Sequence, residues 1–530
     1  MTSLIAERIK KLAEANNFTT IINTKLVGLE KESLRILKNG ELANNSHPKG
    51  LGAALTNSSI TTDYAESQLE LITKPHNYTQ DMVEELFDIH AYIHHVISGN
   101  QFLWPYSIPG KLPKPKDILI ARYGTSANAK FKELYRLGLS YRYGKTMQLI
   151  CGIHYNFSFS TDLWPGYFHK LSGLTNTQWD QHAIDNEYMK LIRNYMRVSW
   201  IVSYLFGSSP AFNTSFINKD IAVANYLKIL NKNTYLAPYG TSLRSSNLGY
   251  HNKSGTDLII NYNSLSDYTA GLHTAITTNS ADFQDIGLYR RNKLIQINTN
   301  LLQIENEYYG VIRPKPQITN KNTPLFKELN TNGIAYIELR NIDLNPYEPN
   351  GISYEQCIFL EILIYYCLLL PSAEFTVQER AAIKSNNEKA TLIGRQPNLQ
   401  LSLNRTNISL QDWALDIFTD LEIIADYFDK AVNSTLYSKV IIQYRQLIEN
   451  SDLTPSALIK KELESNQLDY IDLFLQKAQE HDAYFAAQDL KKLDYYSQLA
   501  YDSLQKRNQQ EHYDKNHQID LDALISRYFA

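Results

Sequence analysis

Three segments of the chain alternate between apolar side chains and polar or charged ones: residues 26–36, 152–158 and 334–340. Successive side chains of a β-strand point to opposite faces of its sheet, so each segment predicts a strand with one dry face and one polar face. On the first strand the polar face carries Glu30 and Glu32. An ordinary antiparallel sheet with one solvated face alternates in the same way, so the pattern by itself predicts strands rather than a site.

Two further segments have the same period, residues 67–73 and residues 303–307, and the first of them places Gln68 and Glu70 on one face. Solvated strand faces usually carry Thr, Ser, Lys or Gln. Here the polar faces carry carboxylates, His, Asn and Arg, which bind hard cations and phosphate groups. This composition favours an acidic sheet face that holds two or more Mg²⁺ or Mn²⁺ ions, with a solvated face as the alternative.

The composition limits the classes of partner. Lys and Arg number 52 against 55 Asp and Glu, so the chain lacks the basic excess that binding to nucleic acid or to an anionic membrane needs. The longest apolar stretch, residues 357–370, contains Glu361 and ends before Pro371. It is shorter than the ~20 residues of a membrane span and predicts a buried helix. Without a signal peptide at the N-terminus, we expect a soluble cytoplasmic protein.

The order of patterns predicts an α+β fold. Strand-like segments mix with helices, such as the one expected over residues 79–97, until about residue 355, and helical periodicity then prevails. We therefore expect an α+β body at residues 1–355 and a mainly helical part at residues 356–530 packed on it. No flexible linker separates the two parts, which favours one compact unit.

Two familiar motifs are absent or weak. Five residues separate Gly138 from Gly144-Lys145-Thr146, where a phosphate-binding P-loop has four between its two glycines, so this run is not a P-loop. His90 and His94 have a spacing that could hold zinc, but no Glu follows His90. Both lie beside an apolar stripe, which favours structural histidines.

Long runs of the sequence resemble glutamate–cysteine ligases of the proteobacterial type. They include GLEKESLRILKNGELANNSHPKGLGAALTNSSITTDYAESQLELIT (28–73), QLICGIHYNFS (148–158) and GIAYIELRNIDLNP (333–346), and the resemblance covers most of residues 20–400. It implies a glutamine-synthetase-like fold, in which a curved antiparallel sheet forms a funnel surrounded by helices. It also implies ATP-dependent joining of the glutamate γ-carboxylate to the cysteine amine through γ-glutamyl phosphate, the first step of glutathione synthesis.

The resemblance also implies roles for individual residues. Arg340 would meet the transferring phosphoryl group, Arg244 would hold a substrate carboxylate, and Arg313 and Lys315 would lie on the nucleotide side. A His among the metal ligands suggests that Mn²⁺ is accepted beside Mg²⁺. The cysteine pocket would be lined by Tyr135, Leu139, Gln148 and Tyr250. The metal ligands would be Glu30, Glu32, Asp63, Glu70, His154 and Glu338.

The expected partners are therefore small molecules, namely L-glutamate, L-cysteine and ATP, bound by a monomer. Other functions remain open: a related ligase with another amine acceptor, a guanidino kinase, or a non-catalytic protein that stores divalent ions. The resemblance assigns no functional residue beyond about residue 400.

Overall fold

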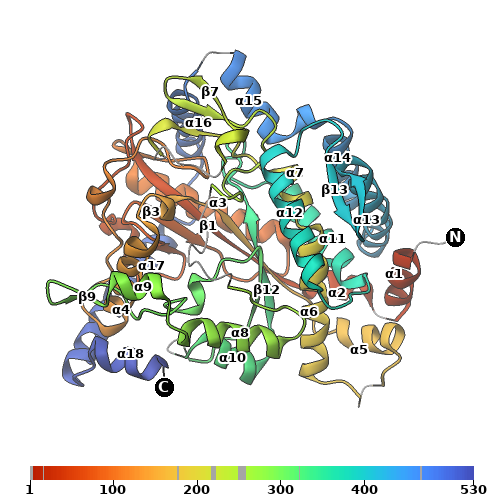
Figure 1. Cartoon of the computed structure of the whole chain (residues 1–530), viewed down its shortest axis with the longest axis horizontal. Helices are drawn as coiled ribbons and strands as arrows, with labels where there is room; N and C mark the ends of the chain where they lie inside the picture. Colours follow the sequence, from red (N-terminus) through yellow and green to blue (C-terminus); the bar gives the residue numbers. More distant parts are fainter. Residues whose placement is uncertain are drawn as a thin grey trace.

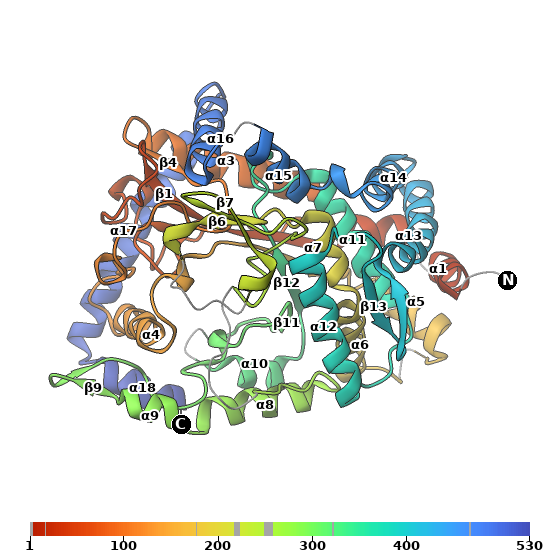
Figure 2. The ribbon, with the colours of Figure 1, turned by 45° about the horizontal axis from the view of Figure 1, so that its top comes forward.

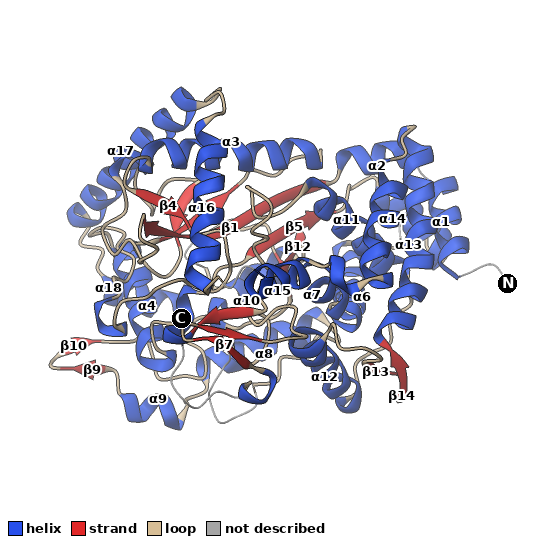
Figure 3. Cartoon of the chain, turned by 90° about the horizontal axis from the view of Figure 1, so that it is seen from above, coloured by secondary structure: helices blue, strands red, loops and turns tan. Residues whose placement is uncertain are grey.

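The computed structural model describes residues 4–15, 17–175, 178–216, 223–248, 258–320, 323–465 and 468–529. Its centre is a seven-stranded antiparallel sheet in the order β11–β12–β5–β1–β3–β2, with β4 also paired to β1. Figure 3 shows these strands enclosed by helices. The strands of this sheet are β1 (Leu26–Leu37), β2 (Ile60–Thr62), β3 (Gln68–Ile72), β4 (Gln101–Leu103), β5 (Ile153–Ser158), β11 (Ile312–Lys315) and β12 (Tyr336–Ile342).

Smaller sheets and many helices complete the fold (Figure 1). The other strands are β6 (Ala211–Asn213), β7 (Lys228–Asn231), β8 (Thr234–Leu236), β9 (Tyr289–Arg290), β10 (Lys293–Leu294), β13 (Gln400–Leu403) and β14 (Thr406–Ser409). The α-helices are α1 (Leu4–Ala15), α2 (Phe18–Thr24), α3 (Thr79–Ile97), α4 (Ala127–Tyr143), α5 (Leu163–Tyr167), α6 (Gln181–Val198), α7 (Trp200–Phe206), α8 (Leu265–Thr277), α9 (Ala281–Ile286), α10 (Leu325–Asn332), α11 (Tyr354–Leu369), α12 (Val377–Ile393), α13 (Leu410–Val432), α14 (Leu436–Glu449), α15 (Pro455–Ser465), α16 (Tyr470–Ala486), α17 (Leu493–Asn516) and α18 (Leu521–Phe529).

Four of the predicted strands are confirmed as β1, β3, β5 and β12, and they are neighbours in the sheet. Their register places Glu30 opposite His154 and Glu32 opposite Glu70. Because opposed residues of an antiparallel pair share a face, the polar sides of the strands form one continuous surface. The dry side is covered by helices: α3 contacts β1, and on α11 the ring of Tyr365 packs 6.0 Å from that of Phe157.

The expected strand over residues 303–307 is wrong. Residues Glu305–Glu307 form a 3₁₀ turn, η7. The Gln303 backbone N–H donates to the Glu307 carboxylate at 2.8 Å, and Arg142 pairs with the same carboxylate at 3.1 Å. These buried polar contacts favour a turn over an extended strand, although the alternation of polar residues is the same.

The C-terminal part is helical, as expected, but it also contains the β13–β14 hairpin. Asn404 and Arg405 connect the two strands with positive φ angles of 49° and 67°, which suit a tight two-residue turn. One apolar cluster extends from Ile5 in α1 to Tyr496 in α17, so the helices pack on the sheet through a shared core. Within the described part of the chain, none of the helices is long and apolar enough to span a membrane.

Candidate active site

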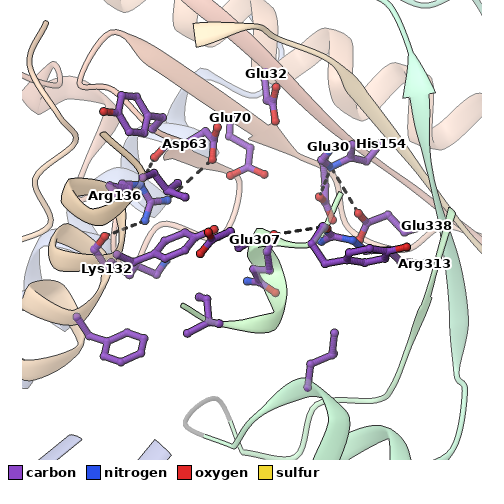
Figure 4. A pocket seen from close by; sticks show the side chains of 18 of the residues that line it. Glu30, Glu32, Asp63, Glu70, Lys132, Arg136, His154, Glu307, Arg313 and Glu338 are labelled. Atoms are coloured by element: carbon purple, nitrogen blue, oxygen red, sulfur yellow. Dashed lines mark hydrogen bonds and ion pairs between the residues drawn. The ribbon is translucent and has the colours of Figure 1, made fainter. Parts of the chain in front are cut away.

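A cavity of about 930 Å³ lies against the polar face of the sheet (Figure 4). Tyr250 lies outside the described residues. All the other site residues predicted from the sequence line this one cavity: Glu30, Glu32, Asp63, Glu70, Tyr135, Leu139, Gln148, His154, Arg244, Arg313, Lys315, Glu338 and Arg340.

Helix α4 forms one wall of the cavity. Its N-terminus is capped by Ser126, whose Oγ accepts a hydrogen bond from the Ala129 N–H at 3.2 Å. Sequence analysis named Tyr135 and Leu139 on this helix but missed four lining residues. Together with Tyr135 and Leu139, the missed residues are spaced three or four positions apart, as on one face of a helix, so helical spacing would have found them. They are Asn128, Phe131, Lys132 and Arg136.

Glu338 on β12 is surrounded by cationic side chains. Lys315 Nζ lies 2.7 Å from its Oε2, and Arg340 Nη1 donates to its Oε1. Burial disfavours ionisation of this carboxyl, but the charges of Lys315 and Arg340 hold its pKa well below the ordinary range. Glu338 is therefore a carboxylate, and its cations are directed into the cavity, where a phosphate could bind.

Glu30 on β1 is held by neighbours on β5. His154 Nδ1 lies 3.0 Å from its Oε2, and Asn156 donates from Nδ2 to its Oε1 at 3.0 Å. Burial and the Arg340 charge lower the pKa of His154, which favours the neutral imidazole. A neutral ring that donates Nδ1–H to Glu30 keeps the lone pair of Nε2 for a ligand.

The other end of the polar face gathers the acids Glu32, Asp63 and Glu70. Burial and the charge of Asp63 raise the pKa of Glu32 to about 8. Burial and the charges of Glu30, Asp63 and Glu32 raise the pKa of Glu70 well above its ordinary value. The charge of Asp63 opposes the ionisation of both Glu32 and Glu70, and a bound divalent cation would relieve that repulsion.

The predicted metal ligands share one face, but they are not gathered into one coordination group. Among the described residues, no three His, Cys, Asp or Glu side chains lie close enough to hold an ion together. The donor set, carboxylate oxygens with one imidazole, still fits Mg²⁺ or Mn²⁺ in chemistry. The raised pKa values of Glu32 and Glu70 support the same fit, because both acids lack sufficient compensating charge.

Arg244 reaches the cavity from the loop after β8. Its Nη2 donates to the Arg340 backbone oxygen at 3.0 Å, and its Nη1 lies 3.7 Å from Asp343 Oδ1. Asp343 is buried and accepts hydrogen bonds from Ser209 Oγ at 2.6 Å and Ser242 Oγ at 2.9 Å. Sequence analysis missed Asp343, although it lies in the quoted run of residues 333–346.

The model of a protein family described as glutamate-cysteine ligase matches residues 9–390. The chain belongs to the glutamate–cysteine ligase family. A glutamate–cysteine ligase of Pseudomonas fluorescens is 37% identical over 532 residues, covering 100% of this chain and 98% of the relative. The glutamate–cysteine ligase of Shewanella oneidensis is 40% identical over 479 residues, covering 90% of each chain.

Solved structures are similar over nearly the whole chain. The glutamate–cysteine ligase of Francisella tularensis, in complex with AMP, has a TM-score of 0.87 and 33% identity, covering 96% of this chain and 97% of the other. A bifunctional glutathione synthetase of Pasteurella multocida has a TM-score of 0.70 and covers 91% of this chain and 57% of its own length. At 22% identity the second likeness concerns the fold alone.

The two histidines at zinc-like spacing are not part of this ligase-family site. His90 Nε2 lies 2.8 Å from Lys31 Nζ, and His94 Nδ1 lies 2.9 Å from Asp482 Oδ1. Both rings stack on Phe485, with centroids 5.2 and 4.7 Å away. These contacts support the interpretation of both as structural histidines.

Proposed function

We propose that this protein joins the γ-carboxylate of L-glutamate to the amine of L-cysteine, with ATP as co-substrate and γ-glutamyl phosphate as intermediate. The products would be γ-glutamylcysteine, ADP and phosphate, in the first step of glutathione synthesis. The observation that carries the proposal is that thirteen residues predicted for this reaction line one cavity in a chain that belongs to the ligase family. The AMP complex of the Francisella tularensis relative supports a nucleotide as a substrate of this protein.

We infer that the seven-stranded sheet is the curved funnel of glutamine-synthetase-like enzymes, with residues 1–355 as catalytic body and residues 356–530 as a helical part packed on it. The shared apolar cluster from Ile5 to Tyr496 supports one compact unit.

Charge neutralisation is the central task of the first step. The glutamate γ-carboxylate is already a competent nucleophile toward the γ-phosphorus, so no general base is needed. Two anions must be brought together, and Arg340, Lys315 and Arg313 supply positive charge in the cavity. Glu30, Glu32, Asp63, Glu70, His154 and Glu338 would hold Mg²⁺, which supplies further neutralisation of the phosphate oxygens when bound.

The second step requires protection from water. An acyl phosphate hydrolyses unless the cysteine amine reaches it first. We assign Tyr135, Leu139 and Gln148 to the cysteine pocket, together with Tyr250 by resemblance, because rigid, mostly apolar walls exclude water. Arg244 would hold a substrate carboxylate and so orient the attacking amine.

The decisive experiment measures ADP release with each amino acid singly and with both together. Release that requires glutamate and cysteine supports the ligase. No release in any mixture would favour a metal-storage protein, and release with a guanidino compound as acceptor but without either amino acid would favour a kinase. Release with glutamate and a different amine, but not with cysteine, would favour the related ligase.

A further inference from the structure

The C-terminal helices α17 and α18 lie beside the cavity, although both are beyond residue 390, where the family match ends. Lys506 and Gln510 of α17 and Tyr528 of α18 are among the residues that line it. Figures 1 and 2 both show α18 next to α4. Lining residues therefore come from a part of the chain to which sequence analysis assigned no function.

Helix α17 is fastened to the loop that precedes β2. Ser503 Oγ accepts a hydrogen bond from the Ala53 N–H at 2.8 Å, and Thr56 Oγ1 donates to the Ser503 backbone oxygen at 2.5 Å. Gly52 has a φ of +80°, and a Cβ at this position would lie 2.3 Å from Ser503 Oγ. Glycine thus permits both the turn and the close approach of α17.

The same helix holds the N-terminus of α4 with two acidic side chains. Buried Asp514 accepts a hydrogen bond from the Ala127 N–H at 2.8 Å, and Glu511 accepts one from the Thr125 N–H at 2.8 Å. Ala127 is the first residue of α4, where N–H groups lack partners within the helix, and Thr125 immediately precedes the N-cap Ser126; the helix dipole favours negative charge at this end. Helix α17 therefore supplies capping interactions to the helix that carries Tyr135.

Helix α18 connects α4 to the opposite wall. Its Tyr528 ring packs 5.4 Å from that of Phe131 on α4. The Tyr528 hydroxyl donates to Glu305 Oε2 at 2.6 Å, and Glu305 Oε1 accepts a hydrogen bond from the Phe326 N–H of α10 at 3.4 Å. The C-terminal helices thus contact both walls of the cavity.

We propose that α17 and α18 form a clasp that positions α4, with Asp514 as the positioning residue for the amino-acid pocket of Tyr135 and Leu139. This rests on the proposed function, because the pocket is assigned to cysteine there. Loss of the Asp514 cap would free the first turn of α4 and shift the pocket face of the helix. Binding of the acceptor should weaken, while the phosphate-facing charges on β11 and β12 keep their places.

The test compares Asp514→Ala with Asp494→Ala, a change at an exposed acid on the first turn of the same helix. We expect Asp514→Ala to raise the KM for cysteine about fivefold, with kcat within about twofold and the KM for ATP unchanged. Asp514→Asn keeps an oxygen acceptor and should recover most of the affinity. Asp494→Ala should resemble the unmodified protein.

Hydrogen–deuterium exchange without substrates gives a second measurement. Amides of residues 125–139 should exchange faster in Asp514→Ala than in the unmodified protein. Unchanged exchange there, or equal rises in the KM for cysteine and ATP, would overturn the clasp. If Asp514→Ala does not fold, Glu511→Ala applies the same criteria at Thr125. If the unmodified protein releases no ADP with both amino acids, the proposed function fails, while the exchange result still decides on the clasp.

Discussion

Gly152→Ala offers a direct test of the position of Arg244. A Cβ on Gly152 would lie 1.8 Å from Arg244 Nη2 and 2.4 Å from its Cζ. Ordinary van der Waals contact begins at 3.4 Å, so the guanidinium nitrogen would have to retreat by about 1.6 Å. Its 3.0 Å hydrogen bond to the Arg340 backbone oxygen could not survive such a shift.

The expected loss follows from what the guanidinium is proposed to do. A hydrogen bond to a charged group contributes about 1.5–3 kcal/mol, and each ~1.4 kcal/mol is a factor of ten, so kcat/KM should fall roughly 10- to 100-fold. Gly152 does not have a left-handed φ, so the added Cβ strains no backbone torsion and its effects act through the displaced Arg244 side chain. Steady-state kinetics and thermal unfolding of the same preparation separate the loss of activity from any loss of stability.

Gly28→Ala is a matched control for this change. Gly28 lies on β1 of the same sheet. A Cβ on Gly28 would lie 3.7 Å from Thr73 Oγ1 and 3.8 Å from the Asn156 Cβ, which is ordinary van der Waals contact. This variant should keep its activity. The reasoning is refuted if Gly152→Ala retains normal kcat/KM, or if it reduces the activity of an Arg244→Ala protein by the same factor as that of the unmodified one.

Four other predictions follow from the site. Arg340→Lys keeps the charge but loses the planar fork, so kcat should fall by the equivalent of about 2–4 kcal/mol with the KM for glutamate little changed; a rise only in the KM for cysteine would place Arg340 in the acceptor pocket instead. Glu30→Ala and Glu338→Ala should each remove most activity at saturating Mg²⁺ and be far from additive together, whereas near-normal turnover of Glu30→Ala would contradict its role. Burial and Asp63 raise the pKa of Glu32 from its usual 4.5 to about 8. The stability contributed by the neutral acid is therefore complete below about pH 4.5 and is lost as the pH rises through 8. Denaturation without Mg²⁺ from pH 5 to 9 should show this loss, and an identical profile for Glu32→Gln would exclude it. Glutamate labelled with oxygen-18 in its γ-carboxylate should deliver one labelled oxygen to phosphate per peptide bond formed, and unlabelled phosphate would rule out γ-glutamyl phosphate.

The polar face of the sheet was predictable because a strand has a strict period of two. Once Glu30 and Glu32 are placed on one face of β1, pairing with β5 and β3 brings His154 and Glu70 to the same face. Residues 303–307 have the same alternation and form a turn instead. The difference lies in Arg142, a distant residue that pairs with Glu307 and that no local pattern connects to it.

The arrangement of charge within the cavity was beyond prediction for the same reason. Glu338 and Glu30 have partners in the protein, Lys315 and His154, whereas the pKa values of Glu32 and Glu70 are raised by burial and by other acids. The alternation of polar and apolar residues places all four carboxylates on one face of the sheet. It does not show which of them have a basic partner and which do not. The distinction comes from β11, which lies at one edge of the sheet and brings Lys315 only to the β12 side. The acids with raised pKa values, Glu32 and Glu70, lie opposite each other on β1 and β3, away from β11. A cation that enters the cavity therefore gains most from the Glu32 and Glu70 end, while a phosphate gains most from the Lys315 and Arg340 end.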